Sequence, residues 1–452
     1  MSSLLSLKLT NQLLAQSSTP VVDDYKGLVC VFLLGGLDSY NLLLPGDAGY
    51  DNYLDTRGIL GIPRDVDTDT MNLRKIVDTS LSQDFHVNPN TLGIKQMFDD
   101  GDLSFIANVG SLVEPTTREQ YLDGSVALPY GLFSHNDQIE QWQVSYSTSK
   151  VSSYSGTGWA GRILDILNDT ANPNATISPA MAPYGANLTL VGRTVAPFLT
   201  NGGADALDMY KSDTLIQMGM DATLEAEYAS VLQAHHNYIR KESLAQSEEV
   251  EAIEQNTVIS TVFPTSSIGK QLLQIAKYIK ANKENVDGNG VPINKRQTFF
   301  AGQTGYDTHG GGLDVVGTQL LELNEALTAF NAAMKEIGAH DEIVTYTATD
   351  FGRTLTPNSA GSDHAWGGNT MVMGGAVTGG RVFGEYPEIV LDTSTDLGRG
   401  RQLPTTSVDQ LHASLAHWFG IGNNSDMETV VPNIRNFWSA TDTEYPIPGI
   451  FG

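Results

Sequence analysis

Short apolar runs recur along the chain and predict buried strands. They do not alternate apolar with polar residues, so both faces of each strand are expected to be covered. Loops rich in Gly, Asn and Ser follow most of these runs. The runs lie at Gly27–Leu34, Leu103–Val109, Gln297–Ala301, Ile343–Ala348 and Met371–Met373, with a shorter β-like piece at Leu188–Val191.

Apolar residues three and four positions apart predict helices between these strands. Strands that alternate with helices predict an α/β fold, here a three-layer α/β/α sandwich with a mostly parallel central sheet. The predicted helices are Pro89–Asp99, a helix that starts at Ser134, Gly158–Asn168, Asp221–Gln255, Ser266–Ala281, Val315–Ile337 and Val408–Phe419.

The 452 residues are expected to form a single domain over 27–452, preceded by an N-terminal segment, 1–26. The helical region at about 195–265 is expected to be an insertion rather than an independent domain. No Pro-, Gly- or Ser-rich linker brackets it cleanly, as would be expected around a separate domain.

The net charge of the chain limits the kinds of molecule that it is expected to bind. The net charge of −26 argues against binding nucleic acid or anionic lipid, since both need a basic surface. No apolar run is long enough to predict a membrane span. The single cysteine, Cys30, lies in the first strand and is expected to be a buried small hydrophobe. The first 20 residues show no export signal; a short amphipathic helix and the tail of a longer targeting segment both remain open.

Polar residues that could carry chemistry cluster after the predicted strands. The carboxyl ends of parallel strands lie along one sheet edge, so these groups are expected to converge. The candidates are Asp38, followed by Ser39 and Asn41; Ser134 and His135; Asp307 and His309; and Asp350, Arg353, Asp363 and His364.

These residue types allow more than one kind of site. Asp with His suits a Zn²⁺-type ion, whereas carboxylates with Asn suit Ca²⁺ or Mg²⁺. Ser134 fits an N-cap, but a serine at a helix start can also serve as a nucleophile beside a bound anion. Arg353 could bind an anion or pair with a neighbouring carboxylate. No P-loop, GxGxxG, GxSxG or HExxH motif is present.

A series of motifs resembles the domain-of-unknown-function-1501 family, sulfatase-like proteins of the alkaline-phosphatase-like superfamily that are mostly bacterial and exported. The resemblance runs from about residue 27 to 420. The motifs are LVCVFLLGGLDSYNLLLP, NVGSLVEPTTREQY, LFSHNDQIEQWQ, GYDTHGG, TDFGRT, GSDHAWGGNTMVMGGAVTGGRVFGEYP and LPTTSVDQ.

The resemblance implies an alkaline-phosphatase-like fold with one or two metal ions at the sheet edge. Ser134 matches the family's nucleophile, and Ser39 is a rival for that role. Two features depart from the superfamily: Phe351 stands where the phosphatases have a metal-binding His, and the sulfatase signature is absent. The positions that match metal ligands are Asp38, Asp307, His309, Asp350 and His364.

Together these observations predict a periplasmic or extracellular, metal-dependent hydrolase of sulfate or phosphate esters, acting on a small-molecule or glycan ester. Ser134, His135 and Arg353 are the catalytic candidates, and Asp363 joins the metal candidates. The alternative is a non-catalytic extracellular scaffold that keeps the fold and binds a glycan, Ca²⁺ or other exported proteins. The metal stays open between Zn²⁺, Ca²⁺ and Mg²⁺.

Overall fold

A nine-stranded sheet forms the centre of the computed structural model, which describes residues 22–63, 74–148, 156–200, 214–438 and 444–452. β1 pairs in parallel with β8 on one side and with β9 on the other, whereas β10 runs antiparallel to both β5 and β9. The expected mostly parallel sheet is therefore confirmed. Its order is β11 (Val382–Phe383), β5 (Leu103–Gly110), β10 (Gly368–Met373), β9 (Ile343–Thr349), β1 (Lys26–Leu33), β8 (Arg296–Gln303), β6 (Ala180–Ala182) and β7 (Phe198–Leu199), with β12 (Thr406–Ser407) paired to β5.

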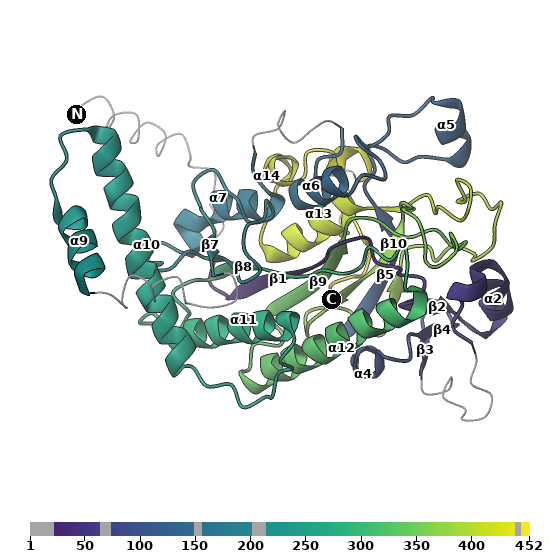
Figure 1. The fold of residues 1–452 in the computed structure, drawn as a ribbon, viewed down its shortest axis with the longest axis horizontal. Coiled ribbons are helices and arrows are strands. Elements are labelled where there is room, and N and C mark those ends of the chain that lie inside the picture. The colour runs from purple at the N-terminus through teal and green to yellow at the C-terminus, as the bar shows by residue number, and fades with distance from the viewer. Residues whose placement is uncertain (1–21, 64–73, 149–155, 201–213, 439–443) are drawn as a thin grey trace.

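Helices cover both faces of this sheet, which completes the predicted α/β/α sandwich (Figure 1). Each face packs as a separate apolar core, because side chains of every central strand point alternately to opposite sides. One face carries α4 (Leu92–Asp99), α11 (Ser267–Glu284) and α12 (Gly312–Glu336). The other carries α6 (His135–Val144), α7 (Trp159–Ala171), α13 (Val408–Phe419) and α14 (Asn424–Val430).

Smaller elements surround the sandwich. A three-stranded sheet stands beside it in the order β2 (Leu43–Pro45), β4 (Gln83–Val87) and β3 (Lys75–Asp78). The remaining short elements are η1 (Asp47–Gly49), α2 (Tyr50–Arg57), η2 (Gly58–Leu60), α5 (Arg118–Asp123) and η5 (Ile434–Asn436).

Two sequence-based predictions of elements were wrong. The predicted helix over 221–255 is two helices, α9 (Thr214–Glu225) and α10 (Val231–Asn256), and Ser230 caps the second by accepting from the backbone of Gln233. A capping side chain inside an apolar pattern starts a new helix at that point. Leu188–Val191 forms a turn rather than a strand, because the amide of Val191 bonds back to the carbonyl of Leu188.

α9 and α10 project from one end of the sandwich as a hairpin (Figure 1). In the part of the chain that the structure describes, no helix is both long and apolar enough to cross a membrane.

The loops after β1, β8 and β9 leave the sheet at the same edge, where the chain also enters α6. The amide of Gly35, just after β1, donates to Asp350 Oδ1 after β9 at 3.1 Å. The amide of Tyr306, after β8, donates to the carbonyl of Leu34 at 3.1 Å. These bonds bring segments more than 270 residues apart into contact at one place.

Candidate metal centre

Three side chains, one from the start of α6 and two from the loops after β8 and β9, point their ligand atoms at one another. His135, Asp307 and His364 each offer one atom, and these atoms all lie within 4.8 Å of one another. Asp307 Oδ1 lies 3.5 Å from His135 Nε2 and 3.6 Å from His364 Nε2. His309 joins them, with its Nε2 at 3.1 Å from Asp307 Oδ1 and 2.9 Å from His364 Nε2. We call these four residues the His–Asp cluster.

Four separations between ligand atoms of the His–Asp cluster have the size found around a tetrahedral metal ion. Metal–nitrogen bonds of about 2.0–2.1 Å in a tetrahedral site place neighbouring ligand atoms about 3.3 Å apart. The separations of 2.9–3.6 Å within the cluster bracket that value. His135 Nε2 is buried and has no hydrogen-bond partner among the described residues, so an ion would satisfy it.

Neighbouring groups orient each imidazole through its other nitrogen, as is usual around metal-binding histidines. Asp350 Oδ2 lies 2.6 Å from His135 Nδ1. The carbonyl of Phe133 holds His364 Nδ1 at 2.8 Å, and Asp363 Oδ1 lies 3.3 Å from His309 Nδ1. Each of these rings therefore turns its Nε2 toward the centre, where those of His309 and His364 meet at 2.9 Å.

Electrostatics favour forms that suit a cation at Asp307 and His364, and the opposite form at His135. Burial opposes a charge on Asp307, but the Arg353 guanidinium outweighs it and lowers the pKa of that carboxyl. Burial lowers the pKa of His364, which favours the neutral imidazole. The hydrogen bond that His135 Nδ1 donates to Asp350 raises the pKa of His135, which by itself favours the protonated imidazolium. Asp307 is thus a carboxylate at neutral pH and His364 a neutral imidazole.

Asp350 and Asp363 act on the cluster through its histidines. Asp350 is 1% exposed, and its two oxygens are occupied by Gly35 and His135. Asp363 pairs with Arg399 at 2.6 Å as well as with His309. Both candidates lie in the site, where they position histidines.

Arg353 is fully buried and acts as a structural brace. Its guanidinium donates to backbone carbonyls of the loops after β1, β8 and β9 and forms an ion pair with Asp307 at 2.5 Å. These contacts fix Asp307 against the loop after β1 and leave the guanidinium engaged with protein groups.

Asp38 lies outside the cluster. It is 2% exposed and forms a buried ion pair with Arg57 of α2, whose guanidinium also donates to the carbonyls of Thr354 and Leu355. The pattern of the first strand indicated a chemically important aspartate but gave no sign of this partner. Ser39 is also buried, and its hydroxyl accepts from the amide of Asn369 at 2.8 Å.

Ser134 occupies the N-cap position of α6, next to His135. Its hydroxyl makes no capping bond, and no other hydrogen bond to it is found within the described ranges. The residue before it, Phe133, has a φ of 71°, an unusual value for a bulky side chain. This strained residue is the one whose carbonyl orients His364, and strain of this kind concentrates at functional sites.

Phe351 follows Asp350 directly and packs against the cluster. Its ring centroid lies 4.8 Å from that of His135 and 4.6 Å from that of His364. The phenyl ring therefore packs against two imidazoles of the cluster and supplies no ligand.

Two arginines beside the cluster were not among the sequence candidates. Arg399 reaches it through Asp363, and Arg401 Nε donates to the carbonyl of His364 at 3.3 Å. The alternation Gly-Arg-Gly-Arg at 398–401 is the signal that could have indicated them, because glycine permits a tight loop.

A second polar group, Asp47, Asp84 and His86, also has the spacing of a metal site. Lys75 already pairs with both carboxylates, at 2.8 and 2.9 Å. A lysine thus pairs with both carboxylates of this group, whereas in the His–Asp cluster Arg353 pairs with the single carboxylate and leaves the imidazoles without a cation among the described residues.

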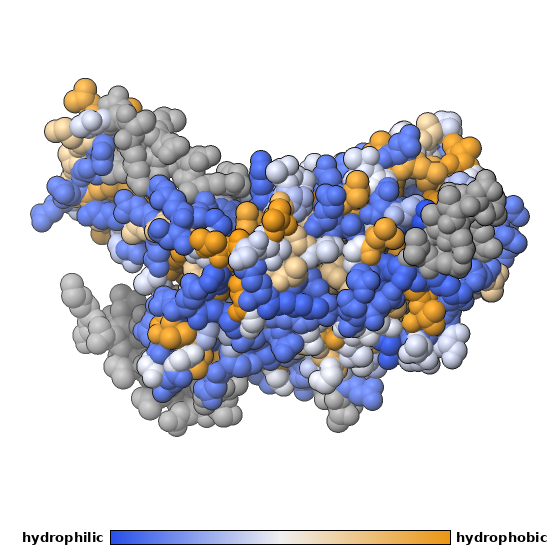
Figure 2. All heavy atoms as spheres, turned by 90° about the horizontal axis from the view of Figure 1, so that it is seen from below, coloured by the Kyte–Doolittle hydropathy of each residue, from blue (hydrophilic) through white to orange (hydrophobic). Residues whose placement is uncertain are grey.

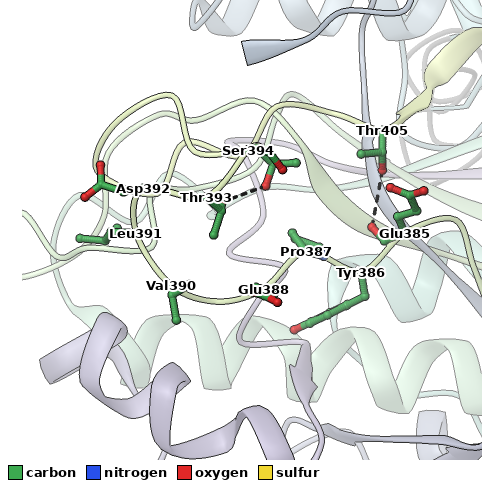
Figure 3. A pocket seen from close by; sticks show the side chains of 11 residues that line it. Glu385, Tyr386, Pro387, Glu388, Val390, Leu391, Asp392, Thr393, Ser394 and Thr405 are labelled. Carbon is green, nitrogen blue, oxygen red and sulfur yellow. Dashed lines mark hydrogen bonds between the residues drawn. The ribbon is translucent and has the colours of Figure 1, made fainter. Parts of the chain in front are cut away.

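One surface cavity lies beside the loop that carries Arg399 and Arg401. A cavity of about 550 Å³ is lined by residues 385–388 and 390–395 and by Thr405 (Figure 3). Its walls carry carboxylates and hydroxyls, including Glu385, Asp392 and Thr393. This segment leads directly into the loop that carries Arg399 and Arg401.

The sequence matches one family model, "Protein of unknown function (DUF1501)", over residues 94–433. Among curated proteins, none matches the sequence.

Similar solved structures are distant in sequence. Ps i-CgsB in complex with k-i-k-neocarrahexaose is 10% identical, with 91% of this chain and 77% of that chain covered and a TM-score of 0.35. The lipoteichoic acid synthase LtaP from Listeria monocytogenes is 9% identical, with 95% and 81% covered and a TM-score of 0.37. The C-terminal periplasmic domain of EcEptC from Escherichia coli, in complex with Zn, is 9% identical, with 92% and 90% covered and a TM-score of 0.34.

Proposed function

We propose that this chain, which belongs to the family described as "Protein of unknown function (DUF1501)", is a metal-dependent enzyme. The proposed reaction is the hydrolysis or transfer of phosphate or sulfate esters. The observation that carries this proposal is the His–Asp cluster, with an unengaged serine hydroxyl next to it in the chain. Imidazole and carboxylate ligands suit Zn²⁺ better than Ca²⁺ or Mg²⁺, which prefer oxygen ligands.

His135, Asp307, His309 and His364 would hold the ion. A divalent ion bound there would act as a Lewis acid toward an ester oxygen. Asp350 keeps the ring of His135 turned toward the centre, and the carbonyl of Phe133 does the same for His364.

Ser134 is the proposed nucleophile. It lies at the N-terminus of α6, where backbone N–H groups favour developing negative charge. Its oxygen would bond to the phosphorus or sulfur as the ester bond to the alcohol breaks, and the serine proton would end on the departing alcohol. Water or a second alcohol would then take the group from the serine, whose hydroxyl regains a proton. Ser39 is a weaker choice, because its buried hydroxyl is engaged with β10.

Elemental analysis of the purified protein, together with turnover of nitrophenyl phosphate and nitrophenyl sulfate, tests this proposal. We expect bound Zn²⁺ and turnover of at least one ester. His364→Ala should lower both the metal content and the turnover, whereas Ser134→Ala should keep the metal and lose turnover by about 100-fold or more.

His235→Ala is the matched control, because His235 is an exposed histidine of α10. It should leave both measurements unchanged. A wild-type protein with neither metal nor turnover would contradict the proposal, and bound metal without turnover on any ester would favour the non-catalytic alternative.

A further inference from the structure

The loop at 396–401, which we call the arginine loop, is built around one buried carboxylate. Asp396 is 1% exposed, and its Oδ1 accepts from the amides of Gly398 at 2.7 Å and Gly400 at 2.8 Å. Its Oδ2 accepts from the amide of Asp392 at 2.9 Å, so the carboxylate ties the cavity-lining segment to the loop. These bonds fix the shape of the loop independently of any ligand.

The backbone of the arginine loop is strained in a way that presents Arg399 and Arg401. Gly398, Arg399 and Gly400 have φ values of 99°, 62° and 72°, three left-handed residues in succession. Glycine adopts this region readily, but an arginine there costs about 1 kcal/mol or more. Such a conformation persists only where the surroundings impose it, and it points to function.

The Nε atom of Arg401 makes a hydrogen bond, whereas its two terminal nitrogens make none to the described residues. Its Nε donates to the carbonyl of His364, and its guanidinium carbon lies 5.5 Å from the ring centroid of Phe133. Its two terminal nitrogens have no hydrogen-bond partner among the residues that the structure describes. Arg353 and Arg399, by contrast, are both paired with carboxylates.

Arg401 contacts residues next to both parts of the proposed site, the His–Asp cluster and Ser134. The carbonyl that it contacts belongs to a cluster histidine, and the ring below it belongs to the residue just before Ser134. A planar guanidinium whose two terminal nitrogens are both unengaged matches a tetrahedral oxyanion, to which these two nitrogens can donate together.

We propose that Arg401 is a specificity-determining residue that binds the phosphate or sulfate group of the substrate beside Ser134 and the His–Asp cluster. This inference rests on the proposed function for the identity of the substrate. The binding of a free oxyanion can be measured without any turnover.

Titration calorimetry with inorganic phosphate and, separately, inorganic sulfate tests the assignment on the full chain, with metal content measured in parallel. We expect Arg401→Gln to weaken binding of the preferred anion at least tenfold while the metal content and melting temperature stay as in the wild type. Arg401→Lys should recover part of the affinity, because it keeps the charge without the planar fork. Arg435→Gln, at a surface arginine paired with Glu428, is the matched control and should bind like the wild type.

Two results would overturn the assignment: unchanged anion binding in Arg401→Gln, or no binding of either anion to the wild type at millimolar concentration. Loss of metal together with anion in Arg401→Gln, with both retained in Arg401→Lys, would also overturn it, since Arg401 would then serve to hold His364. A wild type that binds phosphate through Arg401 but contains no metal would refute the proposed function and leave the present inference standing.

Discussion

Two arginines near the cluster differ in how fully the protein surrounds them, and this predicts different effects on stability. Arg353→Ala leaves buried carbonyls and Asp307 without their donor, so we expect the free energy of unfolding to fall by about 3–5 kcal/mol. Arg399 is 43% exposed, so Arg399→Ala should change it by no more than about 1 kcal/mol. Urea unfolding of both variants checks this, and equal effects would contradict the assigned roles.

A buried carboxylate away from the cluster predicts a pH dependence of stability. Burial raises the pKa of Asp409 to about 6 from its ordinary 3.8, although the Ser145 hydroxyl donates to it at 2.6 Å. Between these two values the folded protein binds more protons than the unfolded chain, so this group lowers stability as pH rises from about 4 through 6. Asp409→Asn removes the effect, and its stability relative to the wild type should rise by about 3 kcal/mol between pH 4 and pH 8.

Urea unfolding of both proteins at the two pH values measures this difference. Ser145→Ala serves as a comparison, since it removes the donor to Asp409 but keeps the titrating carboxyl. A relative stability of Asp409→Asn that stays constant with pH would show that the carboxyl does not titrate in this range.

At the residue scale, the sequence predicted the members of the cluster better than their partners. Asp307, His309 and His364 follow strand ends, and a parallel sheet brings such positions together. The pairing of Asp38 with Arg57 could not be read from the sequence, because no local pattern links a loop residue after β1 to the end of α2.

At the scale of elements, two helix starts predict different changes in the free energy of unfolding when a serine hydroxyl is removed. The Ser134 hydroxyl makes no capping bond to α6, so Ser134→Ala should change the free energy of unfolding by less than about 0.5 kcal/mol. The Ser407 hydroxyl caps α13 within a capping box with Gln410, so Ser407→Ala should lower it by about 1 kcal/mol. Thermal or urea unfolding distinguishes the two, and a loss of stability in Ser134→Ala would indicate a structural role for its hydroxyl.

The buried strands were predicted well because their apolar runs are continuous. β1 and β9 are buried along nearly their whole length, and both coincide with predicted runs. The antiparallel direction of β10 and the break between α9 and α10 were missed. Strand direction depends on the path of the connecting chain, which the apolar runs do not indicate. The break between the helices depends on one capping residue, Ser230, which hardly changes the apolar pattern.

At the scale of the whole molecule, the face drawn in Figure 2 is largely hydrophilic, with apolar residues scattered over it, some of them at the end that holds α9 and α10. Leu215 of α9 and Val231 and Leu232 of α10 are each 80–82% exposed. The buried residues Leu224 and Asn237 contact each other, so the outer part of the hairpin packs mainly on itself. Further along α10, Glu254 accepts from the hydroxyl of Tyr278 in α11 at 2.8 Å.

This arrangement predicts that the outer hairpin can be removed while the sandwich stays folded. Replacing residues 214–243 with a flexible Gly/Ser linker should keep the metal content and change the melting temperature by only a few degrees, because exposed projections tolerate such changes. Val250→Asp is the contrasting variant: it places a charge at a position 1% exposed, where α10 joins the body, and should lower the melting temperature markedly. If the shortened protein loses its metal or unfolds at a much lower temperature, the hairpin belongs to the core of the domain, and the predicted insertion at about 195–265 is an integral part of it.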